Sequence, residues 1–395
     1  MYLRPIKTNE TYQLLFDGSN VDYSNNPTQN LSQIDWNVFN EKAMESHLAP
    51  LLHKNLSGVS GYNQIPENTR AHLKNAYNQV LARNVILQQV FVDFVSLLNK
   101  EQIPVIPLKG IYLGEVVYKD IGARHLSDID VLIQEKDLTH VCDLMRNRGW
   151  SVKSMTMHSK IAEEEFTHAH PATLVKSHVS IELHTHLYNR NQGTSISKKE
   201  LWGDTYSEQF LGVEIRQLSS ELLLQHLCLH LHKHLVGHEL KILNFCDIRE
   251  FLVVQKDNFS WQRFKNLAEQ YSCKEEIDQI LYLCVKYWNV SIPKDFLNSE
   301  MQDTKLNERF WNFMSGDSKK EKQFLKNRLS IKNRNISQLK SNKDRLTFLQ
   351  GFVFPTSDFM RKRYNLTADG RLFPWYVYRP IELSIKTFKA LFTTD

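Results

Sequence analysis

The feature that most constrains the fold is a pair of aspartates inside an apolar run, residues 126–133 (LSDIDVLI). Side chains along a β-strand alternate between its two faces, so a strand here would send Asp128 and Asp130 to one face while Ile129 and Val131 enter the core. Two neighbouring carboxylates repel each other unless a cation lies between them, and Mg²⁺ accepts carboxylate, phosphate and water oxygens. The pattern therefore predicts a divalent-metal site on a buried strand.

A turn upstream of the aspartates adds a candidate phosphate site. Residues 104–108 (PVIPL) form a short apolar run that ends at Lys109-Gly110, and a helix-compatible segment follows. A glycine between a strand and a helix lets backbone N–H groups approach a phosphate, and a lysine there adds positive potential. We expect Lys109 and Gly110 to contact nucleotide phosphates, together with Arg124, which lies four residues before Asp128.

Taken together, L-K-G, Tyr118 and R-x-x-x-D-I-D-V-L-I resemble the uncharacterised bacterial nucleotidyltransferases of the DNA polymerase β-like superfamily. The resemblance implies an α/β (α+β) fold, a mixed sheet with helices, framed here by N-terminal helices and a C-terminal helical region. It also implies transfer of a nucleoside monophosphate from an NTP, with two Mg²⁺ ions or, alternatively, Mn²⁺ as cofactor. The sequence differs from the superfamily at large in having Lys109 and Ile111 around the glycine, where glycine-serine is usual, and 17 residues between Gly110 and Asp128.

A third carboxylate is supplied by Glu182. Residues 163–188 predict two strands joined by a short turn near 176–178, and in the second strand Ser180, Glu182 and His184 share the polar face. The resembling family has an acid followed by leucine and histidine at this place. The resemblance therefore makes Glu182 a catalytic metal ligand beside the two aspartates, although a surface glutamate on an edge strand is the competing interpretation.

The second informative stretch is histidine-rich. His226, His230 and His234 are spaced by four and so stack on one face of a predicted helix that starts at Ser219 or Ser220. A zinc site is one interpretation, but no further metal-binding motif completes the ligand set. The alternatives are structural histidines or a face turned toward a nucleotide cleft.

We assign nucleotide contact to four further residues: Ser127, His184, His230 and His234. Two charged residues later in the chain are harder to place. Asp247 and Arg249 either pair on a helix surface or line the cleft, and the sequence leaves both open.

At 395 residues the chain exceeds the usual size of one core. We expect an N-terminal helical segment (1–100), a nucleotidyltransferase core (101–215), a helical domain that completes the cleft (216–315) and a basic, aromatic C-terminal segment (316–395). The strongest local prediction is a long helix from Glu67 to Lys100, which has apolar residues at helical spacing throughout.

The composition of the chain indicates its cellular compartment and its possible charged partners. The chain shows neither a secretory signal nor an apolar run of membrane-spanning length, and its five scattered cysteines suggest free thiols in the cytoplasm. The net charge is +5, and residues 319–345 carry ten basic and two acidic side chains. A solvated helix face or linker is the favoured interpretation of that stretch, ahead of contact with nucleic acid, an acidic partner or a membrane.

The leading hypothesis is Mg²⁺-dependent transfer of a nucleotidyl group from an NTP to an acceptor hydroxyl or phosphate. A small molecule, a peptide or protein side chain and an RNA end all fit as the acceptor. The alternatives are a non-catalytic nucleotide-binding module of the same fold and a metal-dependent phosphohydrolase.

Overall fold

A computed structural model describes residues 10–20, 31–154, 171–188, 196–237, 240–293, 295–297, 304–315, 342–364, 366–367 and 370–392. Most of the basic stretch 319–345 lies outside these ranges, as do residues 155–170, where the predicted pair of strands was expected to begin.

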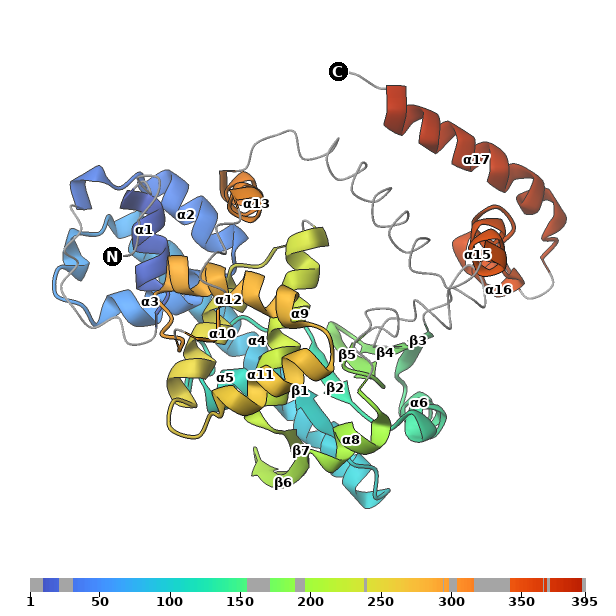
Figure 1. Cartoon of the computed structure of the whole chain (residues 1–395), viewed down its shortest axis with the longest axis horizontal. Helices are drawn as coiled ribbons and strands as arrows, with labels where there is room; N and C mark the ends of the chain where they lie inside the picture. Colours follow the sequence, from blue (N-terminus) through green and yellow to red (C-terminus); the bar gives the residue numbers. More distant parts are fainter. Residues whose placement is uncertain are drawn as a thin grey trace.

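A five-stranded mixed sheet with the order β1-β2-β5-β4-β3 carries the predicted motifs. Its strands are β1 (Ile106–Leu108), β2 (Ile129–Leu132), β3 (Ser151–Ser154), β4 (Ala172–Lys176) and β5 (Val179–His184). β2 and β5 run parallel, and every other neighbouring pair is antiparallel. The expected hairpin before His184 is present as β4 and β5, and the mixed sheet with helices confirms the predicted fold class (Figure 1).

The long predicted helix forms with the predicted bounds, as α4 (Glu67–Lys100). It packs against α3 (Ala49–Ser57) and the second strand of a separate two-stranded sheet, β6 (Thr205–Phe210) and β7 (Val213–Leu218). Within the described part of the chain, α4 alone is long and apolar enough to cross a membrane, and 33% of that stretch is buried inside the protein. This finding rests on the length and composition of the helix alone.

The remaining helices surround the sheet or extend from it (Figure 1). They are α1 (Glu10–Gly18), α2 (Trp36–Glu45), α5 (Gly110–Val116), α6 (Leu138–Arg146), α8 (Lys198–Gly203), α9 (Ser220–Gly237), α10 (Leu243–Val254), α11 (Trp261–Gln270), α12 (Lys274–Trp288), α13 (Thr304–Ser315), α15 (Asn342–Val353), α16 (Ser357–Arg363) and α17 (Phe373–Phe392). The helix α9 packs against α10, α11 and α12, whereas α15, α16 and α17 form a group of their own, drawn in red.

An aromatic cluster joins helices that are far apart in the sequence. Phe16 on α1, Phe245 on α10, Trp288 on α12 and Phe310 on α13 are fully buried. The rings of Phe245 and Trp288 stack with centroids 4.6 Å apart, and those of Phe16 and Trp288 are 4.9 Å apart. Burial of four such rings is a large apolar contribution, and it fastens α1 and α13 to the helices beside the sheet.

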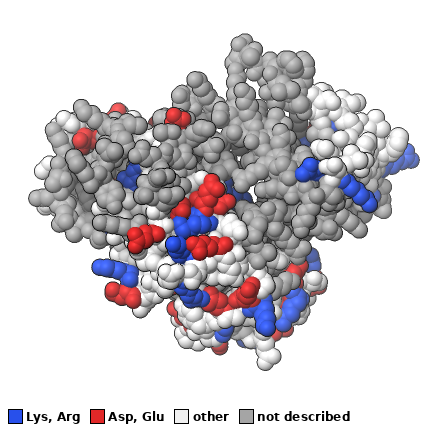
Figure 2. Space-filling model, viewed as in Figure 1, with Lys and Arg blue, Asp and Glu red and all other residues white. Residues whose placement is uncertain are grey.

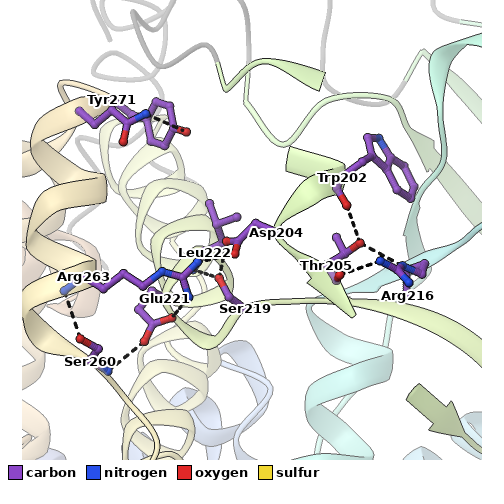
Figure 3. Close-up of polar contacts among 11 residues, drawn as sticks. Trp202, Asp204, Thr205, Arg216, Ser219, Glu221, Leu222, Ser260, Arg263 and Tyr271 are labelled. Carbon is purple, nitrogen blue, oxygen red and sulfur yellow. Dashed lines mark hydrogen bonds and ion pairs between the residues drawn. The ribbon is translucent and has the colours of Figure 1, made fainter. Parts of the chain in front are cut away.

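A polar network fastens the two-stranded sheet to the helical region (Figure 3). Arg263 on α11 forms ion pairs with Asp204, which lies between α8 and β6, and with the buried Glu221 on α9. Glu221 also accepts a hydrogen bond from the backbone N–H of Ser260 at 2.9 Å. Because Glu221 is buried, these partners offset the cost of removing its charge from water.

Candidate active site

The site is built on the parallel pairing of β2 with β5. In their register Asp130 lies beside Glu182, and Leu132 lies beside His184. Ile129, Val131, Ile181 and Leu183 alternate with these residues and are fully buried in the core. The ligand atoms of Asp130, Glu182 and His184 all lie within 4.8 Å of one another, and the described residues contain no other group of three such side chains this compact.

Asp130 is buried and carries two positively polarised partners. Nζ of Lys109 donates a hydrogen bond to its Oδ1 at 3.0 Å, and Nε2 of His184 lies 2.8 Å from the same oxygen. Burial alone would raise the pKa of Asp130, but the Lys109 charge and the His184 hydrogen bond lower it well below its usual value. Asp130 is therefore ionised at neutral pH.

Glu182 has the opposite electrostatic environment. Burial, and then the negative charges of Asp130 and Asp128, raise its pKa from 4.5 to about 7. Its Oε2 lies 3.8 Å from Nε2 of His184. The group thus has more carboxylate charge than its protein partners neutralise, and its oxygen donors are those that a hard divalent cation prefers. The residues present fit a Mg²⁺ or Mn²⁺ ion.

Asp128 lies just outside the strand, which differs from the expectation that both aspartates belong to it. The ladder of β2 starts at Ile129, and Asp128 sits in the preceding bend, where Ser127 donates a hydrogen bond to its Oδ1 at 2.8 Å. Arg83 on α4 binds the carbonyl oxygens of Leu126 and Ser127 at 3.1 and 2.7 Å. These hydrogen bonds from Arg83 hold the bend in place. Asp128 lies close enough to Glu182 for its negative charge to raise the pKa of Glu182.

The Lys109-Gly110 turn comes directly after β1, as predicted. Lys109 has a φ of 49°, in the left-handed region that a lysine rarely adopts, so the turn is strained. A Cβ on Gly110 would lie 2.5 Å from Nη1 of Arg124 and 2.8 Å from a methyl of Leu126. The glycine is therefore needed for the close approach of Arg124, and its place in the turn brings the Lys109 ammonium to Asp130.

Arg124 forms an ion pair with a residue that the sequence did not identify as its partner. Its Nε and Nη2 donate to the two carboxylate oxygens of Asp247 on α10, at 2.8 and 2.7 Å, and the hydroxyl of Tyr118 donates to the same carboxylate at 2.9 Å. All three side chains are buried. Arg124 thus forms a bidentate ion pair between the sheet region and α10, and its contact with a nucleotide phosphate stays a prediction.

The ion pair with Arg124 shows where Asp247 lies, a point that the sequence left open. It is neither on a helix surface nor paired with Arg249, which instead forms an ion pair with Glu250. The sequence did contain a clue to this partner. Asp247 is an acid within the apolar helix segment 243–254 (LNFCDIREFLVV), and a buried acid needs a basic partner.

The histidines of α9 form a column beside the site. The ring centroids of His226 and His230 are 6.2 Å apart, those of His230 and His234 are 4.4 Å apart, and the Nε2 atoms of the last two lie 3.1 Å from each other. Burial, and then nearby positive charges that include Lys109, lower the pKa values of all three. The charges of Lys109 and Asp130 both act on these pKa values, so the column lies near that pair, and its rings are neutral at pH 7.

The pKa of Glu182 makes the stability of the metal-free protein depend on pH. Because the pKa is raised in the folded state, this group stabilises the fold fully below pH 4.5 and loses that effect as the pH rises through about 7. Glu182→Gln should therefore raise the free energy of unfolding at pH 8, by on the order of 2 kcal/mol, and leave it nearly unchanged at pH 4.5. Urea denaturation in EDTA measures this, with exposed Glu214→Gln as control; equal curves for both variants at pH 8 would contradict it.

Loss of the Arg124–Asp247 pair should be costly, since it strands a buried guanidinium. Asp247→Asn should lower the free energy of unfolding by about 3–5 kcal/mol. The matched control is Asp143→Asn, which removes an exposed pair with Arg146 and should cost less than about 1 kcal/mol. Similar losses for the two variants would show that the buried pair does not hold α10 to the sheet region.

Comparison with known proteins agrees with the geometry. No curated protein is significantly similar to the chain. A family model described as uncharacterised nucleotidyltransferase matches residues 32–289, a span that runs from η1 (Leu31–Gln33) to the end of α12 and contains the sheet, the Asp130 site and the histidine column. The chain belongs to this uncharacterised nucleotidyltransferase family.

Proposed function

We propose that the protein transfers a nucleoside monophosphate from an NTP to an acceptor hydroxyl or phosphate, with Mg²⁺ as cofactor. The observation that carries the proposal is the pairing of Asp130 with Glu182 on neighbouring strands, in a compact group with His184. Family membership supplies the class of reaction, and the oxygen-rich ligand set supports a hard cation.

In this proposal Asp130 and Glu182 hold the metal, with Asp128 as the third carboxylate at the edge of the site. When bound, the metal supplies electrostatic stabilisation of the triphosphate and activation of the acceptor oxygen. His184 holds the Asp130 carboxylate in position through its hydrogen bond. The raised pKa of Glu182 suits a group that binds a proton when the metal is absent and releases it on metal binding.

Lys109 is the phosphate-binding residue of the proposal. Its ion pair with Asp130 places the ammonium at the carboxylate group, so a triphosphate bound there would meet a lysine already desolvated and aligned. Catalysis of this type depends on positioning and charge more than on covalent chemistry. His230 and His234, both neutral, would add hydrogen bonds to the nucleotide, and Ser127 would hold Asp128.

The first test removes the charge of each central carboxylate. Asp130→Asn and Glu182→Gln should each weaken Mn²⁺ binding by more than about a hundredfold and abolish Mg²⁺-dependent pyrophosphate release from NTPs. Electron paramagnetic resonance measures bound Mn²⁺ without any knowledge of the acceptor. Exposed Glu214→Gln on β7 should retain both properties.

Three outcomes separate the function classes. Pyrophosphate release that requires an acceptor supports nucleotidyl transfer. Tight, metal-dependent NTP binding without turnover on any acceptor would point to a non-catalytic module, and inorganic phosphate release without an acceptor would point to a phosphohydrolase. Wild-type metal binding in Asp130→Asn would remove this site from consideration.

A second test concerns Lys109. Because its proposed partner is a phosphate, Lys109→Ala should weaken the binding of ATP by about tenfold or more and leave the binding of adenosine nearly unchanged. Calorimetry with both ligands measures the difference, and Lys153→Ala on β3 is a control lysine. Equal losses for the two ligands would place Lys109 away from the phosphates.

A further inference from the structure

The C-terminal helix α17 has two different faces. One packs on α16 and the loops that flank it: Trp375 stacks on Tyr364 with ring centroids 4.4 Å apart, and the hydroxyl of Tyr376 donates to the carbonyl of Pro355 at 2.7 Å. Glu382 on the same side forms ion pairs with Arg363 and Arg379. These contacts orient the helix and decide which of its residues point away from the group.

The opposite face of α17 is an exposed apolar stripe. Phe373, Val377, Ile381 and Ile385 recur every four residues, and 79%, 55%, 52% and 49% of their surfaces are exposed. Residues spaced by four lie on one side of a helix, so the four side chains form one continuous surface, with Tyr378 beside them. Leaving this much apolar area in water is unfavourable, and such patches mark interaction sites.

The sequence segment that contains this stripe is strongly basic in composition. Residues 316–395 contain 17 basic and seven acidic residues, a net charge of +10, whereas residues 1–315 carry a net charge of −5. Glu382, the acidic residue of α17, is already paired with two arginines. Figure 2 shows the C-terminal helices, on the right of the view, as a mainly white surface bordered by blue.

We propose that α17 is an interfacial helix by which the protein binds the surface of an anionic lipid membrane. An apolar stripe with aromatic residues would enter the boundary between headgroups and acyl chains, and the net positive charge of the C-terminal segment would favour anionic headgroups. The aliphatic members favour lipid over nucleic acid, because Val377, Ile381 and Ile385 offer no aromatic ring for bases to stack on. The proposal stands independently of the nucleotidyl transfer reaction.

The experiment uses the full chain and vesicles of phosphatidylcholine, with or without 30 mol% phosphatidylserine as the anionic probe. We expect cosedimentation with the anionic vesicles only. The double variant Val377→Asp/Ile381→Asp should reduce it by about tenfold or more, since charged side chains do not enter the apolar boundary. Serine at the same two positions should give a smaller loss, which guards against an effect of the aspartates on folding.

The matched control is Val85→Asp/Ile86→Asp on α4, where the two side chains are 52% and 57% exposed, far from α17 in sequence. This variant should bind the vesicles like the wild type. Equal binding to neutral and anionic vesicles, or unchanged binding after the α17 substitutions, would overturn the proposal. The proposal would also be overturned if the α17 substitutions left vesicle binding unchanged and instead abolished a dimer, measured by light scattering. Loss of RNA binding alone, measured by fluorescence anisotropy, would overturn it in the same way.

Discussion

The parallel pairing of β2 with β5 is the constraint on which the candidate site depends. It sets Asp130 beside Glu182 with the core residues Ile129 and Ile181 behind them, so the two acids cannot move apart without disturbing the sheet. Two acids side by side, one buried and one half-buried, are costly in a metal-free protein. The two acids are stabilised differently. The Lys109 ammonium neutralises Asp130 and His184 forms a hydrogen bond with it, while Glu182 takes up a proton more readily than an ordinary glutamate.

Most of the surrounding structure acts to hold this arrangement. Arg124 packs against Gly110, and its buried pair with Asp247 ties the Lys109 turn to α10. The histidines of α9 lie near enough to Lys109 for its charge to lower their pKa values, and as neutral rings they add no repulsion to it. The acids of the candidate site lie on the sheet and the histidines on the helical region that follows it in sequence, and the family model spans both.

The C-terminal helix α17 differs from the earlier helices in how much of its apolar surface it buries. The described helices before the C-terminal group bury their aromatic rings with one another, as in the Phe16–Phe245–Trp288–Phe310 cluster. The helix α17 instead uses one face for packing and leaves an apolar face in solvent, within a segment whose net charge is opposite to that of the rest of the chain. These residues also lie outside the range matched by the family model, so they have no counterpart in the shared core.

The sequence alone determined what depends on local periodicity: the bounds of α4, the alternation of Glu182 with Ile181 and Leu183, the strand that carries Asp130, and the family. Only the tertiary structure decided which side chains meet. Arg124 and Asp247 are 123 residues apart, and Asp130 and His184 are 54 residues apart, so no local pattern could pair them. Likewise, Asp128 lies in a bend outside the strand, where Arg83, on a distant helix, binds the carbonyls of the two residues before it. Side-chain period is a property of a few neighbouring residues, whereas a buried charge takes its partner from whichever element the fold packs against it.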